Sequence, residues 1–157
     1  MSFPTKDTIW GEIEYEDKIY DLLDRPISDE IWNTINLYKQ ENNCGVSSAS
    51  WNANKFKWIV KDNKLFITSL KCRLCKNKSN LIPVIFNVNK LYAKWVSTSI
   101  KLVLSKKELA LDEREEIQIE RELLVLTFEN GILISTHEDV ERYTSKIIKS
   151  YLGESNV

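Results

Sequence analysis

The sequence predicts an α+β fold that is mostly antiparallel β-structure, with about eight strands in a sandwich or a strongly bent sheet and two helices packed on it. Apolar and charged residues alternate around Asp62-Asn63, Asn130-Gly131 separates two apolar runs, and two other segments repeat apolar residues at helical spacing. We expect a single domain over residues 1–157, because a chain of this length buries roughly two thirds of its unfolded surface in one core.

The clearest hairpin is predicted over residues 51–70. Lysines alternate there with Phe56 and Trp58, so a strand would direct aromatic side chains to one face and ammonium groups to the other. Asp and Asn tolerate the positive φ of a tight turn, which favours chain reversal at Asp62-Asn63.

A strand, a turn and a helix are predicted before this hairpin. Residues 9–15 alternate as in a half-exposed strand, and Glu16-Asp17 allows a return along residues 18–22. Ser28 is a suitable N-cap for a helix over residues 28–40, with acidic residues in its first turn. Its sheet-facing stripe contains Ile27, Ile31, Ile35 and Tyr38.

The second half contains further strand patterns. Residues 81–88 are equally consistent with an irregular buried loop and an edge strand, and strands are predicted over 91–96 and 100–104. The charged residues 106–116 are expected to be exposed, and Asn130-Gly131 favours a hairpin between a strand over 117–128 and the residues that follow.

A C-terminal helix is predicted over residues 137–152. Thr136 and Asp139 have the spacing of a capping box. The apolar stripe of this predicted helix contains Val140, Tyr143, Ile147, Ile148 and Tyr151.

The net charge of −1 conceals three blocks of opposite sign. The net charge is −6 over residues 1–54, +12 over 55–107 and −7 over 108–157. Part of this charge is expected to cancel if middle strands pair with outer ones, since opposite charges on neighbouring strands attract. Two interpretations stay open: a mixed surface, and a polarised surface suited to a charged partner.

The cysteines suggest a reduced protein. Cys44, Cys72 and Cys75 occur without a secretory pattern, and no apolar run approaches the roughly 20 residues of a membrane span, so we expect a cytoplasmic location, free thiols and no membrane partner. A zinc site would need Cys44, the Cys72-x-x-Cys75 pair and His137 to meet in the fold. We expect neither a metal nor a cofactor.

No catalytic motif stands out, so we expect a protein that is not an enzyme. His137 is the only histidine, and its position between a predicted strand and a predicted helix favours a capping or surface role over acid–base catalysis. The acidic residues are too numerous for the sequence to single out a catalytic pair. Glycine-rich phosphate-binding motifs are absent.

The basic middle segment suggests one kind of partner. Five aromatic residues lie among its lysines, as in platforms that bind single-stranded nucleic acid: Phe56, Trp58, Phe66, Tyr92 and Trp95. Alternation with lysine, however, points Phe56 and Trp58 away from the basic face, and core packing explains the aromatic residues better. The segment also has a single arginine, Arg73, so nucleic acid is the less favoured partner.

The acidic segment 108–122 suggests another kind of partner. It is either a solvated loop or a negative surface that attracts a basic protein and covers the nucleic-acid site of that protein. We take Trp10 as an aromatic anchor. The predicted acidic contacts are Asp112, Glu113, Glu115, Glu116 and Glu120.

The order and spacing of several motifs resemble a family. Trp51-x6-Trp58, Leu91-Tyr-Ala-Lys-Trp95 and Phe128-Glu-Asn-Gly131 resemble the pattern of a widespread group of small bacterial proteins of uncharacterised activity, over about residues 8–136. This chain departs from the pattern at Asn52-Ala53-Asn54, where the family has Arg-Gly-Tyr, so any function of that triplet would be lost or changed here.

The resemblance implies no reaction. In size and expected location, the family resembles immunity proteins of contact-dependent growth inhibition and related polymorphic toxin systems. The sequence therefore predicts an immunity protein that binds the C-terminal domain of a cognate toxin, a nuclease, and blocks its active site. The alternative is a single-stranded nucleic-acid-binding protein that uses the lysine-rich middle segment.

Overall fold

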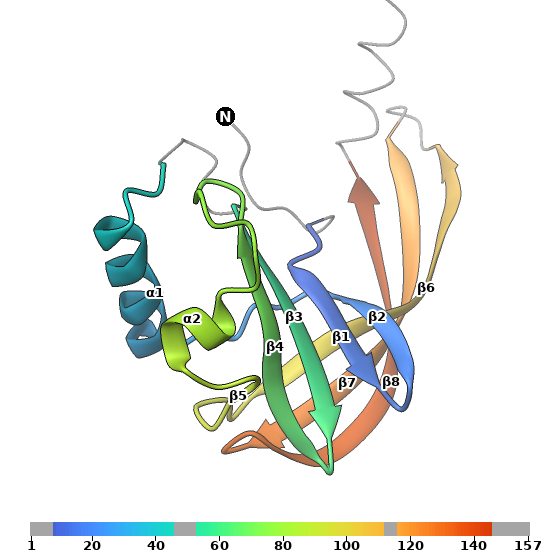
Figure 1. The fold of residues 1–157 in the computed structure, drawn as a ribbon. Helices are drawn as coiled ribbons and strands as arrows, with labels where there is room; N and C mark the ends of the chain where they lie inside the picture. The colour runs from blue at the N-terminus through green and yellow to red at the C-terminus, as the bar shows by residue number, and fades with distance from the viewer. Residues whose placement is uncertain (1–7, 46–52, 112–115, 146–157) are drawn as a thin grey trace, which may run out of the picture.

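The computed structural model describes residues 8–45, 53–111 and 116–145 (Figure 1). They form an α+β fold in which two helices accompany one mostly antiparallel sheet of eight strands, as predicted. The elements are β1 (Gly11–Tyr15), β2 (Lys18–Leu22), α1 (Asp29–Glu41), β3 (Asn54–Lys61), β4 (Lys64–Cys72), α2 (Ile82–Phe86), β5 (Leu91–Tyr92), β6 (Ser99–Leu111), β7 (Ile117–Glu129) and β8 (Ile132–Ser145).

Seven of the strands close into a barrel. The pairing order is β3-β1-β2-β6-β7-β8-β4-β5, and β3 also pairs with β4, so the ring returns to its start and β5 is added outside β4. The β1–β3 pairing is parallel, and the other pairings are antiparallel. At two places neighbouring strands share a single residue pair. Leu22 pairs with Leu102 between β2 and β6, and Lys64 pairs with Ile132 between β4 and β8. The sheet therefore bends sharply at two places.

Three tight turns confirm the predicted hairpins. Glu16 and Asp17 have φ values of 50° and 66°, Asp62 and Asn63 have 53° and 62°, and Asn130 has 52°. Asp and Asn adopt this left-handed backbone region more readily than other residues that carry a Cβ. The local turn chemistry thus fixes the registers of β1 with β2, β3 with β4, and β7 with β8.

Alternation along β3 and β4 builds the barrel core. Phe56, Trp58, Leu65 and Ile67 point inward and are almost fully buried, while Lys55 and Lys57, which alternate with the β3 aromatic residues, stay exposed. The core continues onto β6 and β7 through Ile100, Leu102, Leu126 and Phe128. The sequence-based placement of Phe56 and Trp58 in the core is therefore confirmed.

Helix α1 packs on this core as predicted. The Ser28 side chain accepts a hydrogen bond of 3.3 Å from the Ile31 amide, which satisfies a free N–H group at the helix start. Ile35 is buried, and Ile27, Ile31 and Tyr38 pack against the core cluster. Figure 1 shows α1 and α2 together on one side of the barrel.

Helix α2 differs from both interpretations of residues 81–88. Pro83 lies in the first turn, where its ring already has a helical φ, and the Asn80 side chain accepts 3.0 Å hydrogen bonds from the Ile82 and Leu70 amides. Asn87 ends the helix with a φ of 57°. The five-residue helix is too short to show helical periodicity in the sequence.

The predicted strand over residues 91–96 is shorter in the structure. Only Leu91 and Tyr92 pair with β4. The chain then turns, with a 3.1 Å hydrogen bond from the Val96 amide to the Ala93 carbonyl. The Trp95 indole N–H donates to the Pro26 carbonyl at 2.7 Å, so this side chain joins the turn to the segment before α1.

The predicted helix over residues 137–152 is wrong for residues 137–145, which belong to strand β8. Residues 146–152 lie outside the described part of the chain. The turn at Asn130-Gly131 brings β8 beside β7, and the two strands pair from Glu129–Ile132 to Ile117–Ser145. Only Val140 and Tyr143 of the predicted helical stripe lie in this segment. The backbone hydrogen bonds to β7 therefore stabilise the strand more than this stripe would stabilise a helix.

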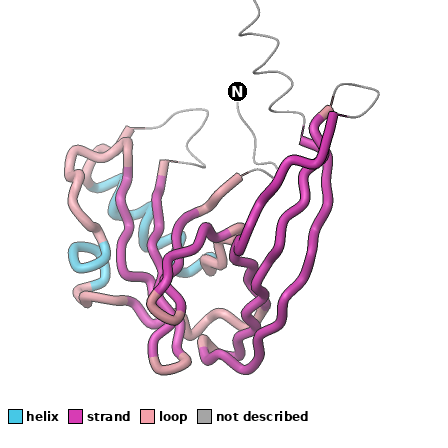
Figure 2. Tube along the Cα trace, turned by 90° about the vertical axis from the view of Figure 1, so that its right-hand side faces the viewer, coloured by secondary structure: helices cyan, strands magenta, loops and turns pink. Residues whose placement is uncertain are grey.

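The ends of β6, β7 and β8 project from the barrel as a three-stranded arm (Figures 1 and 2). We define the arm as residues 103–111, 117–125 and 136–145. Among the described strands, β6 beyond Leu102 and β8 beyond Ile132 pair with β7 alone. Lys106 and its neighbours to 109 are exposed, as expected, but they lie in strand β6.

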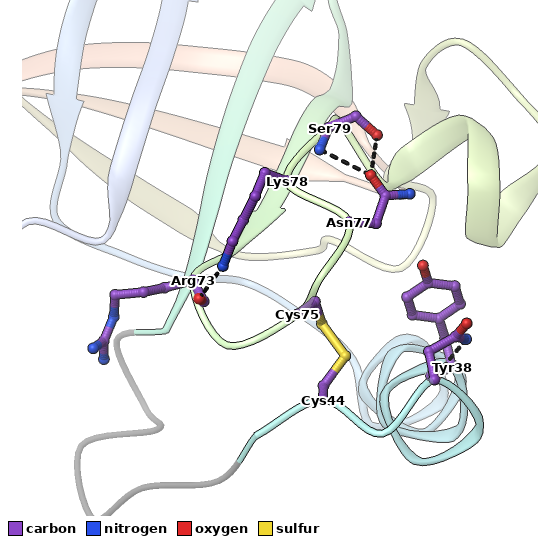
Figure 3. The surroundings of a disulfide bond; sticks show 8 residues. Tyr38, Cys44, Arg73, Cys75, Asn77, Lys78 and Ser79 are labelled. Carbon is purple, nitrogen blue, oxygen red and sulfur yellow. Dashed lines mark hydrogen bonds between the residues drawn. A yellow bond between two sulfur atoms is a disulfide. The ribbon is translucent and has the colours of Figure 1, made fainter.

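A disulfide joins Cys44, just beyond α1, to Cys75 in the loop after β4 (Figure 3). Cys72 is the remaining cysteine, and its thiol is free and buried. The expectation of free thiols is therefore wrong for Cys44 and Cys75. The Gly45 amide donates to the Leu74 carbonyl at 2.9 Å, so a hydrogen bond reinforces the covalent link.

None of the helices in the described ranges combines the length and apolar character needed to cross a membrane.

Replacing Gly11 tests the parallel contact that closes the barrel. An added Cβ at Gly11 would overlap the carbonyl oxygen of Phe56 on β3, whereas a Cβ at Gly45 would have its nearest neighbour 3.6 Å away. We expect Gly11→Ala to lower the free energy of unfolding by about 1–3 kcal/mol, and Gly45→Ala to change it by less than about 1 kcal/mol. Urea unfolding measures both, and equal effects would contradict this packing.

Counting thiols tests the disulfide. After refolding with oxidised glutathione, the unfolded chain should titrate one thiol, and three after reduction, since it has three cysteines. The cysteines are 31 residues apart, so reduction should lower the free energy of unfolding by about 3–4 kcal/mol. A Cys44→Ser variant should lose this sensitivity to reductant. Three reactive thiols before reduction would show that the bond does not form.

Candidate functional site

Of the predicted contact residues, the structure describes Trp10, Glu116 and Glu120. Asp112, Glu113 and Glu115 lie outside the described residues. Glu116 immediately precedes β7, and Glu120 lies within β7. Trp10 immediately precedes β1, at the N-terminal end of the described barrel.

Glu120 holds the three strands of the arm together. Its carboxylate lies 3.1 Å from Lys107 Nζ on β6 and 2.8 Å from Arg142 Nε on β8, and these residues are its direct cross-strand partners. The hydrogen bond from Arg142 lowers the pKa of Glu120 below its usual value, and the hydrogen bond from Lys107 makes the next largest contribution. Because both cations belong to this chain, the ion pairs of Glu120 stabilise the pairing register of the arm strands.

The ring of Trp10 is engaged within the chain. The Arg25 guanidinium lies 4.3 Å from the Trp10 ring centroid and 4.7 Å from that of Trp32 on α1. Stacking of a guanidinium on aromatic faces stabilises both partners, and burial lowers the pKa of Arg25. Trp10 therefore links β1 to α1, and Arg25 occupies a ring face that an anchor would offer.

A different acidic site is present on the arm. A half-open hollow of about 250 Å³ is lined by Leu104, Glu122, Glu138, Asp139 and Val140. Glu122, Glu138 and Val140 share one face of the arm, whereas Asp139 lies opposite Leu123 and accepts a 2.8 Å hydrogen bond from the Val140 amide. Val140 is 57% exposed, and Glu122, Glu138 and Asp139 are also exposed. We call these five residues the acidic hollow. It combines carboxylates with apolar side chains at a surface.

The acidic hollow was only partly visible in the sequence. Glu122 belongs to the acidic segment 108–122, but Glu138 and Asp139 lie in the segment for which a helix was predicted. The register set by Asn130-Gly131 places Val140 opposite Glu122. Extending that hairpin through residue 140 would have brought these residues together.

The opposite face of the arm is packed. Ile117, Ile119 and Tyr143 form a buried cluster separate from the barrel core. The Arg121 guanidinium lies 4.5 Å from the centroid of the Tyr143 ring and bonds to the Glu141 carboxylate at 2.6 Å. Because Arg121 is only 3% exposed, this charge-assisted hydrogen bond is partly shielded from water and fixes the two strands.

Cross-strand pairing cancels part of the basic charge, as the sequence predicted. Lys57 lies 3.9 Å from Glu12 on β1, and Lys101 lies 3.3 Å from Asp24 after β2. Lys107 adds the pair with Glu120. Basic residues of the middle segment thus meet acidic residues from both the first and the last segments.

A half-open hollow of about 360 Å³ lies on the outside of the barrel over β1, β3 and β4. Its lining includes Glu12 and Asp21, which face each other across β1 and β2, and Lys55, Lys57 and Lys71. The Glu12 side chain is 49% exposed and faces Lys57. This hollow therefore presents solvated charges of both signs.

The side chains of the possible zinc site do not gather. Cys44 and Cys75 share a disulfide, Cys72 is buried, and His137 lies on β8 opposite Val125. Within the described ranges, no group of three or more His, Cys, Asp or Glu side chains is placed to hold a metal ion.

Comparison of the chain with protein-family models found no match, and comparisons with curated proteins and with solved structures found none either. The resemblance in motif order and spacing, and the immunity role that it implies, remain predictions.

Proposed function

We propose that this chain is a non-catalytic binding protein whose arm docks onto a basic protein partner. The observation that carries this proposal is the acidic hollow, where Glu122 and Glu138 share one face of the arm with the exposed side chain of Val140. Such a surface suits an arginine or lysine whose aliphatic stem packs on Val140 while its charged end meets the carboxylates.

The distribution of ion pairs supports the choice of this surface. Glu120 and Glu141 of the arm pair with Arg142 and Arg121 within the chain. Neither Glu122 nor Glu138 forms an ion pair among the described residues. An outside cation can therefore bind them without breaking a described pair.

The contacts between the arm strands favour binding without a conformational rearrangement of the arm. The Lys107–Glu120–Arg142 bridge and the Arg121–Tyr143 contact connect its strands on both faces. A structured surface loses little conformational entropy when a partner binds. Negative charge on a projecting element also accelerates encounter with a positively charged protein.

The specific form of this function that we propose is toxin neutralisation. Nuclease domains carry basic surfaces that bind phosphates, so an acidic arm is complementary to the site that must be covered. The chain would then act as an immunity protein in a one-to-one complex with a bacterial toxin domain. Blocking the toxin requires no bond-making centre in this chain.

The test requires a nuclease toxin domain from a neighbouring gene as the probe, purified as an inactive variant. Reversing two charges in the acidic hollow, Glu122→Lys and Glu138→Lys together, should weaken binding roughly 100-fold, because each new lysine repels the basic partner. The loss should shrink at high salt, since salt screens exposed charges. Titration calorimetry at two salt concentrations measures both effects.

A matched control reverses Glu41 and Glu129, two exposed carboxylates outside the arm. The double variant Glu41→Lys and Glu129→Lys has the same net charge as the test variant. We expect it to bind within about threefold of the unmodified protein. Equal losses for the two variants would show that net charge alone matters, and an unchanged affinity for the test variant would place the contact elsewhere.

A further inference from the structure

We propose that the outer surface of β3, β4 and β5 is a second binding site, which takes single-stranded nucleic acid. Its centre is the aromatic pair Phe66 on β4 and Tyr92 on β5. The site lies near the end of the barrel that carries the β3–β4 turn, whereas the arm projects from the other end (Figure 1). It is therefore independent of the proposed docking role of the arm.

The two rings lie on the outside of the barrel. Phe66 and Tyr92 are direct cross-strand partners, with ring centroids 5.7 Å apart and ring planes inclined by 50°. The flanking residues Leu65 and Ile67 are fully buried, and alternation along the strand therefore directs Phe66 outward. Unlike Phe56 and Trp58, both rings are only half-buried.

Lysine ammonium groups lie over the solvent-facing sides of the two rings. The Lys90 ammonium lies 4.4 Å from the centroid of Phe66, and the Lys64 ammonium lies 5.8 Å from that of Tyr92. Both lysines are exposed, so these ring faces are reachable from solvent. A nucleobase can replace an ammonium over a ring, and the displaced lysine can then pair with the adjacent phosphate.

The basic surface continues along the two long strands. Ile59 of β3 lies opposite Phe66, and Lys57 and the Lys55–Lys71 pair follow on the same outer face. The distance along β4 from Phe66 to Lys71 is about 17 Å. Residues 55–107 contain a single acidic residue, Asp62, which lies in the β3–β4 turn. Lys55 and Lys71 thus carry positive charge beyond the two rings, while Lys57, between that pair and the rings, lies 3.9 Å from the Glu12 carboxylate of β1.

The combination of rings and lysines favours single strands over other polyanions. Duplex nucleic acid keeps its base faces stacked, and an acidic protein has no base to place over Phe66 and Tyr92. Lysine acts as a point charge without a fixed geometry, which suits recognition that is independent of sequence. We therefore expect binding with little base specificity.

Fluorescence anisotropy with a labelled 15-nucleotide oligothymidine tests this inference. At 20 mM salt we expect saturable binding that weakens steeply between 20 and 200 mM salt, because phosphate contacts release counterions. Phe66→Leu keeps an apolar side chain but removes the aromatic face, and should weaken binding about tenfold. Lys64→Gln with Lys90→Gln should reduce the salt slope by about 1.4.

Matched controls separate stacking from stability and from general charge. Ile19→Leu changes an exposed apolar residue on β2, outside the proposed site, and should have no effect on binding. Circular dichroism checks that each variant is folded. No saturable binding at 20 mM salt, an unchanged affinity for Phe66→Leu, or equal competition by polyglutamate would overturn the proposal. Equal competition would identify an acidic protein as the occupant.

Discussion

The parallel contact between β1 and β3 is the constraint on which the barrel depends. It joins the first hairpin to the central one, so that β2, β1, β3 and β4 form one continuous half of the ring. Gly11 permits this contact because its missing side chain leaves room for the carbonyl oxygen of Phe56. Phe56 and Trp58 then face inward, and their lysine neighbours necessarily face outward.

That alternation also decides where charge remains available. On the barrel wall, Lys57 and Lys101 pair with carboxylates from the N-terminal segment, so part of the charge separation along the sequence becomes local ion pairs. Among the described residues, charge without an ion-pair partner includes the carboxylates of the acidic hollow and the lysines around Phe66 and Tyr92. A scaffold with this layout is suited to contacts with macromolecules of opposite charge.

Short-range signals were the most informative part of the sequence. The turn at Asp62-Asn63 and the cap at Ser28 act within a few residues, and both were predicted correctly. Residues 137–145 show helical and strand patterns at once, and only the neighbouring strand β7 decides between them. The same missing register concealed the acidic hollow. The disulfide was not predictable either, because spacing alone does not pair three cysteines.

The central claim is that a closed barrel carries an arm in which, among the described strands, β6 and β8 pair only with β7. Amide hydrogen exchange, resolved by residue, tests it most directly. We expect amides of β3, which lies between β1 and β4, to exchange only through global unfolding, and the outward-pointing amides of β8 over residues 136–145 to exchange much faster. Equal protection of these β8 amides and those of β3 would contradict the account.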